Sequence, residues 1–146
     1  MADINLFNSA TPPSYLQQKA ILDFLFEHLE QYGDPREDIE KAMEYSTSQY
    51  PGQGGLILTA EDDEGILGAV VINKTGMSGY IPENILVYIA VHKRARGKGV
   101  GKQLMEESIK MTTGDIALHV EPDNPAVHLY KKVGFTNKYL EMRYKK

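Results

Sequence analysis

The spacing of apolar residues predicts two helices in the first third of the chain. Between residues 12 and 32, apolar side chains recur at helical intervals, at Leu16, Ala20, Leu22, Leu25, Phe26 and Leu29. A second helix is predicted to begin with Asp34 as its N-cap and Pro35 as its first residue, and Glu37 completes a capping box. We expect this helix to end between Ser46 and Ser48.

Apolar runs in the middle of the chain predict three strands. The runs at residues 55–60 and 66–72 flank the acidic glycine turn EDDEG, which is a hairpin signal. Residues 85–91 are apolar without alternation, which is typical of a central strand buried on both faces. A loop with several glycines and prolines separates the hairpin from this strand.

The last third of the chain predicts two helices and two strands. A helix follows the central strand and runs to about Met111, and residues 115–120 form the next strand. Asn124 caps a helix whose first residue is Pro125 and which ends at Gly134. Residues 138–144 are predicted to be a final strand, because they alternate on one face, with Leu140, Met142 and Tyr144.

The order of these elements predicts the fold class. Because a helix separates residues 85–91 from residues 115–120, the two strands are expected to be parallel, with a right-handed crossover. The hairpin makes the rest of the sheet antiparallel. The chain is therefore predicted to be one α/β domain over residues 1–146, with a mixed central sheet flanked by helices.

The segment RARGKGVGKQLM, residues 94–105, places three glycines at the start of a helix. Each glycine costs about 0.5–1 kcal/mol relative to alanine in a regular element, so a ligand that needs bare backbone is the natural explanation. The first four N–H groups of a helix have no partner within it and favour an anion such as phosphate. Neighbouring cations add charge, at Arg96, Lys98 and Lys102.

Composition narrows the class of protein. The net charge is −4, so a basic cluster on an acidic chain favours a small, local anion over general nucleic-acid binding. With no cysteine, the 146-residue chain has no thiolate zinc site and no cysteine nucleophile. The four histidines have no metal-site spacing, so no metal is expected. No apolar run approaches a membrane span and no signal peptide is recognisable, so we expect a soluble cytoplasmic protein.

Two common phosphate-binding motifs fail in the glycine segment. A Walker loop needs Ser or Thr after its Gly-Lys pair, but Gln103 follows Lys102. A dinucleotide fingerprint would need a glycine where Lys102 stands. The pattern that does fit is Arg-x-x-Gly-x-Gly, at Arg96, Gly99 and Gly101.

That pattern after a central strand resembles the pyrophosphate signature of the GNAT superfamily of N-acetyltransferases, (Gln/Arg)-x-x-Gly-x-(Gly/Ala). A second family pattern, N-x-A-x-x-x-Y-x-x-x-G-F, is matched by Asn124, Ala126, Tyr130, Gly134 and Phe135. The resemblance covers about residues 54–136. The preceding residues fit as the two variable helices of the family, with a short first strand in residues 4–7.

The resemblance implies acetyl-CoA as cosubstrate and a parallel strand pair, residues 85–91 and 115–121, that splays apart after its middle. The pantetheine arm would pair with backbone near Ile89, Ala90 and Val91. The remaining coenzyme-binding residues implied are Arg96, Gly97, Lys98, Gly99, Val100, Gly101, Lys102, Asn124 and Tyr130. Tyr130 also matches the family's general acid for the leaving thiolate.

Each of these roles has a structural alternative. Ala126, Leu129, Tyr130 and Val133 follow core helical spacing, so Tyr130 also fits a core position, and Asn124 fits a simple helix cap. An alkyl amine must lose a proton, at a cost of about 4–5 kcal/mol at pH 7, before it can attack. The candidate base is Glu83 or a water chain, with Glu121 and His119 as weaker candidates.

The acceptor is left open by the sequence. In the family that the chain resembles, acceptor pockets use the N-terminal helices and the loop corresponding to residues 74–84. The prediction is acetyl transfer to a primary amine, of a small molecule or a protein, with no nucleic-acid or membrane partner. The alternative is a catalytically silent acyl-CoA sensor. The alternating final strand also predicts that a homodimer could form by sheet extension.

Overall fold

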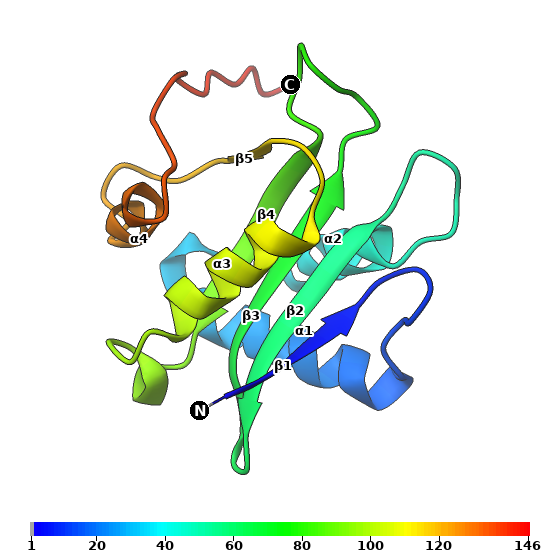
Figure 1. Ribbon diagram of the computed structural model, residues 1–146, viewed down its shortest axis with the longest axis vertical. Coiled ribbons are helices and arrows are strands. Elements are labelled where there is room, and N and C mark those ends of the chain that lie inside the picture. Colours follow the sequence, from blue (N-terminus) through cyan, green and yellow to red (C-terminus); the bar gives the residue numbers. More distant parts are fainter. Residues whose placement is uncertain (1) are drawn as a thin grey trace.

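The computed structural model, which describes residues 2–146, is built on a five-stranded sheet with strand order β1-β2-β3-β4-β5 (Figure 1). Neighbouring strands are antiparallel except β4 and β5, which are parallel. This confirms the predicted mixed sheet of an α/β fold. The strands are β1 Asp3–Phe7, β2 Gly55–Asp62, β3 Gly65–Lys74, β4 Asn84–Val91 and β5 Ile116–Leu118.

Helices cover both faces of the sheet, as Figure 1 shows. On one face lie α1 and α2, and on the other lie α3 and α4. Two short 3₁₀ turns, η1 and η2, follow α1 and β4. The bounds are α1 Tyr15–His28, η1 Glu30–Tyr32, α2 Arg36–Ser46, η2 Lys93–Ala95, α3 Val100–Met111 and α4 Ala126–Lys132.

Because helices cover both faces of the sheet, its inner strands are apolar on both faces. In β2, Ile57 packs toward α1 and α2, whereas Leu58 packs toward α3. In β3, Val71 and Val70 divide in the same way, because successive side chains of a strand point to opposite faces. Both faces are therefore hydrophobic cores.

The start of α2 differs from its prediction. The helix begins at Arg36, and the N-cap residue is Pro35, whose φ of −53° and ψ of 148° lie outside the helix. Asp34 is then one residue too far upstream to cap, and its carboxylate accepts a hydrogen bond from the Tyr88 hydroxyl at 2.5 Å. A long-range partner on β4 thus replaces the predicted local one. The predicted end at Ser46 is confirmed.

The parallel pair β4–β5 is short and then opens, which confirms the splayed pair. Only three residues of β4 pair with β5, and the last pair is Leu86 with Leu118. On its other side, β4 has a bulge, because Val71 faces Tyr88 and Ile72 faces Leu86, which leaves Val87 without a partner on β3. The bulge therefore lies at the point where the two strands part.

The predicted strand over residues 138–144 is wrong. These residues have no regular structure, and Leu140, Met142 and Tyr144 are 86, 90 and 87% exposed. The segment passes close to the end of β5, where Glu141 Oε1 lies 4.0 Å from His119 Nδ1. Alternation alone does not form a strand, because a strand also needs a hydrogen-bonded neighbour. A homodimer stays a prediction, but residues 138–144 provide no strand through which the sheet could be extended.

Other strand predictions fare better. The strand in residues 4–7 is confirmed as part of β1, which pairs with β2. The hairpin of β2 and β3 is confirmed, and the strand predicted at residues 115–120 is confirmed but shortened to β5. Within residues 2–146, no helix has the length and apolar character to cross a membrane.

Candidate active site

The three glycines of the segment 97–101 serve two different purposes. Gly97 and Gly99 have φ of +77° and +83°, in the left-handed region, and nothing lies within 4 Å of a Cβ built on either. Gly101 has no such backbone, but a Cβ there would lie 3.1 Å from Leu129 Cδ2 and 3.5 Å from Val91 Cγ2. The first two glycines therefore shape an open turn, and the third lets α3 pack closely on α4.

The turn leaves backbone donors free at the start of α3. The first backbone bond of the helix runs from Gln103 N to Gly99 O, at 3.0 Å. The preceding N–H groups, of Val100, Gly101 and Lys102, therefore have no acceptor within the helix. The side chains of Lys98 and Lys102 are exposed beside them. Free N–H groups, positive charge and open space fit an anion such as a diphosphate.

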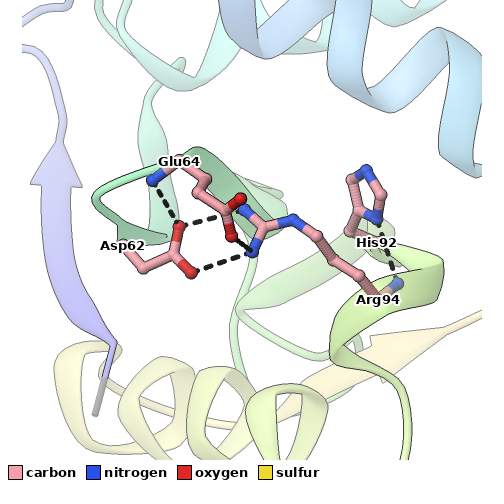
Figure 2. Close-up of polar contacts among 4 residues, drawn as sticks. All are labelled: Asp62, Glu64, His92 and Arg94. Atoms are coloured by element: carbon pink, nitrogen blue, oxygen red, sulfur yellow. Dashed lines mark hydrogen bonds and ion pairs between the residues drawn. The ribbon is translucent and has the colours of Figure 1, made fainter.

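Arg94, a cation near the glycine turn, is engaged in ion pairs with the β2–β3 turn. The Arg94 guanidinium donates to both oxygens of Asp62, at 2.8 and 2.9 Å, and to Glu64 at 3.2 Å, as Figure 2 shows. The hydrogen bonds from Arg94 hold the pKa of Asp62 well below its usual range. His92 Nδ1 accepts from Arg94 N at 3.1 Å. Arg94 therefore ties the β2–β3 turn to η2, and it is not an anion ligand.

The open edge of β4 involves only some of the predicted residues. His92 N donates to Leu67 O at 2.7 Å, so His92 faces β3. The N–H and C=O groups of successive residues point to opposite sides of a strand. The backbone groups of Ala90 therefore also point to β3, and those of Ile89 and Val91 point to the gap left by β5. Val91 O agrees with this orientation, because it accepts from Arg96 Nε at 3.2 Å.

Tyr130 occupies the core position that its helical spacing predicts. The residue is 8% exposed among the core residues under α3, and its ring centroid lies 6.0 Å from that of Phe135. Its hydroxyl makes no hydrogen bond within residues 2–146. Burial raises the pKa of Tyr130 to about 12, so the hydroxyl keeps its proton at neutral pH. The core position is confirmed, and the acid role remains a prediction.

The helix α4 begins at Ala126 with Pro125 as its N-cap, one residue later than predicted, but Asn124 still caps the first turn by hydrogen bonds. Its side-chain oxygen accepts from Ala126 N at 2.9 Å, and its carbonyl accepts from Val127 N at 3.1 Å. Its predicted contact with the coenzyme is a separate role that this cap does not exclude. Gly134 ends the helix with φ of +110°.

Glu83 is not brought together with the other predicted residues. It precedes β4, whereas Ile89 is six residues further on, which corresponds to about 20 Å along a strand. Its two carboxylate oxygens accept from Asp115 N at 2.8 Å and from Gly79 N at 3.2 Å. These backbone hydrogen bonds lower the pKa of Glu83, which weakens it as a base. Glu121 and His119 are exposed beyond the end of β5.

The structure also reveals neighbours of the site that the sequence did not indicate. The rings of His28 and His92 contact each other at a tilt of 39° with centroids 4.3 Å apart, and burial is the main cause that lowers the pKa of His28. The Arg96 side chain, predicted to hold the pyrophosphate, donates from Nη2 to Glu30 at 2.9 Å. The bulge at Val87 is a third such feature. None has a sequence signal, because each depends on residues far apart in the chain.

Comparisons with known proteins agree with this geometry. The family model described as "Acetyltransferase (GNAT) domain" matches residues 53–137. No curated protein sequence matches the chain significantly. A putative acetyl transferase from Pyrococcus furiosus is 22% identical, with a TM-score of 0.62 and coverage of 99% of this chain and 100% of that one.

Two further solved structures share the fold at lower identity. An aminoglycoside N-acetyltransferase in complex with CoA is 16% identical, with a TM-score of 0.70 and coverage of 100% and 96%. A ribosomal-protein-alanine N-acetyltransferase from Brucella melitensis biovar Abortus 2308 is 16% identical, with a TM-score of 0.66 and coverage of 100% and 99%. Because the family match spans more than half of the 146 residues and includes the glycine turn, the splayed strands and α4, this chain belongs to the GNAT acetyltransferase family.

Proposed function

We propose that this protein transfers an acetyl group from acetyl-CoA directly to a primary amine. The observation that carries the proposal is the position of free N–H groups at the start of α3, directly after the open edge of β4. A diphosphate bound at the turn would meet these donors together with Lys98 and Lys102. The amide arm of the coenzyme would then follow the backbone of Ile89 and Val91 into the gap.

Residues of two elements would take part in acetyl transfer, the open edge of β4 and Tyr130 on α4. The acceptor amine must be neutral to attack the thioester carbonyl, and a free N–H on the open edge of β4 is suited to polarise that carbonyl. As the carbon–sulfur bond breaks, negative charge grows on sulfur, where the Tyr130 hydroxyl would donate a hydrogen bond. Its pKa of about 12 exceeds the value of about 8.5 for a free thiol, so donation is favoured over complete proton transfer.

We propose a water chain as the route for the amine proton. Glu83 is the alternative, but its lowered pKa, its two backbone hydrogen bonds and its place at the far end of β4 all argue against it. The two backbone hydrogen bonds stabilise the charged carboxylate, so protonation of Glu83 would weaken them.

The acceptor class follows only broadly from charge. A net charge of −4 mildly favours a cationic amine, such as a polyamine, a lysine side chain or a protein N-terminus. The two similar enzymes named above are called an aminoglycoside and a ribosomal-protein-alanine N-acetyltransferase, which are a small-molecule and a protein class of acceptor. Both classes therefore belong in the first screen.

The test of the function is release of free thiol from acetyl-CoA in the presence of a panel of amines. The panel contains polyamines, aminoglycosides, lysine peptides and peptides with free N-termini. Release that depends on one of these amines supports an enzyme. Tight binding of acetyl-CoA with no release across the whole panel would instead support the acyl-CoA sensor.

A kinetic prediction follows from the absence of cysteine. Without a thiol nucleophile, transfer should occur in a complex that holds both substrates, so double-reciprocal plots at varied substrate concentrations should intersect. The matching measurement is mass spectrometry after incubation with acetyl-CoA alone, which should show unmodified protein. Parallel lines together with a stoichiometric acetyl adduct would contradict direct transfer.

A further inference from the structure

The segment Leu29–Gly33, which contains η1 and is called here the η1 bridge, touches both sides of the gap between β4 and β5. On one side, Glu30 Oε1 accepts from Arg96 Nη2 at 2.9 Å. On the other, the Tyr32 hydroxyl donates to Asp123 O at 3.3 Å. Arg96 follows β4, and Asp123 follows β5. The η1 bridge therefore crosses the open end of the splayed pair, and Figure 1 shows this segment beyond α1 reaching toward α4.

The backbone of Glu30 is unusual. Its φ of +55° is the one positive value at a non-glycine residue within residues 2–146. A non-glycine residue in this region is held there by its surroundings, and such outliers gather at functional sites. The Glu30 side chain contacts Arg96, whose hydrogen bond is the main cause that lowers the pKa of Glu30.

The ion pair between Glu30 and Arg96 is weak enough for another anion to replace Glu30. The two side chains are 37% and 49% exposed, and such a surface pair changes an equilibrium by at most about fivefold. A diphosphate at the glycine turn carries more charge than one carboxylate and would also meet the N–H groups at the start of α3. Glu30 and a bound diphosphate would therefore compete for the Arg96 guanidinium, and the diphosphate would win.

We propose that Glu30 is a positioning residue that closes the η1 bridge over the gap when no coenzyme is bound. Binding of the coenzyme diphosphate takes Arg96 from Glu30 and releases the bridge from the β4 side. The contact of Tyr32 with Asp123 then holds the bridge alone. Release frees the bridge at the β4 side of the gap, on the sheet face covered by α1 and α2, where the acceptor amine can approach the thioester. This inference rests on the proposed function.

The first experiment measures affinity for coenzyme A by calorimetry. Glu30→Gln removes the competing charge, so coenzyme A should bind two- to fivefold more tightly than to the wild type. Glu37→Gln is the matched control, because it changes the net charge equally at an exposed residue with no ion pair or hydrogen bond within residues 2–146. It should leave the affinity unchanged. Equal or weaker binding by Glu30→Gln would overturn the competition.

The second experiment measures amide hydrogen exchange in the wild type with and without saturating coenzyme A. Peptides over residues 97–102 should exchange more slowly with coenzyme, and peptides over residues 29–33 should exchange faster. Tyr32→Phe should speed exchange in residues 29–33 without coenzyme and leave residues 97–102 unchanged. Protection at residues 97–102 with slower or unchanged exchange at residues 29–33 would overturn the proposed release of the η1 bridge and leave the proposed function standing. No heat of binding and no protection at 97–102 would overturn the proposed function.

Discussion

Replacing Tyr130 by phenylalanine is expected to lower kcat by about 10²–10⁴-fold, the usual contribution of a group that donates to a charge formed in the transition state. The ring, which packs beside Phe135 under α3, is kept, so the melting temperature should change little. Affinity for acetyl-CoA should also persist, because the hydrogen bond strengthens only as charge develops on sulfur. Steady-state kinetics, calorimetry and thermal melting together measure these three quantities.

The control for this substitution is Tyr50→Phe, since Tyr50 is 76% exposed and its hydroxyl makes no hydrogen bond within residues 2–146. It should leave all three quantities unchanged. A lower melting temperature for Tyr130→Phe with kcat preserved would make Tyr130 a core residue only. A fall in kcat of less than about threefold, with the melting temperature unchanged, would mean that water protonates the thiolate, and the assignment of Tyr130 as the acid would be withdrawn.

The pH profile of the wild type gives an independent check on Tyr130. Because its pKa is raised to about 12, the hydroxyl stays protonated and able to donate throughout the neutral range. It would lose its proton, and with it the ability to donate, only as pH rises through that value. The rate should therefore rise with pH as the amine loses its proton, with no decline from Tyr130 below about pH 11. A decline between pH 8 and 10 that disappears in Tyr130→Phe would contradict this environment.

Replacing Gly99 by valine is expected to weaken acetyl-CoA binding at least tenfold, or about 1.4 kcal/mol. Gly99 has φ of +83°, which a β-branched residue adopts only with strain, so the turn and the N–H groups that follow it would shift. The added side chain would also fill the open space over the turn. Calorimetry with acetyl-CoA measures the loss, and circular dichroism verifies that the variant is folded.

Gly52→Val is the matched control for strain. Gly52 has φ of +85° and equally open surroundings, but it lies in the loop before β2, away from the glycine turn. Both variants should lose similar stability, and only Gly99→Val should lose affinity. A folded Gly99→Val protein that binds acetyl-CoA as tightly as the wild type would remove the glycine turn from the coenzyme site.

The sequence by itself determined the parts of this protein that depend on near neighbours in the chain. The helical spacing of α1, the hairpin turn between β2 and β3, and the glycines before α3 each act over a few residues, so their patterns predict them directly. The motif at Arg96, Gly99 and Gly101 belongs to the same group. These local signals were sufficient for the fold class and for the family.

Only the tertiary structure decided which long-range partner each polar side chain takes. Asp34 binds Tyr88 instead of capping α2, Arg94 binds Asp62 instead of an anion, and Glu83 binds two backbone amides. Residues 138–144 have the alternation of a strand but no neighbour to pair with. The physical reason is that periodicity encodes which face of an element is buried, whereas hydrogen-bond partners far apart in the chain depend on how the elements meet in space.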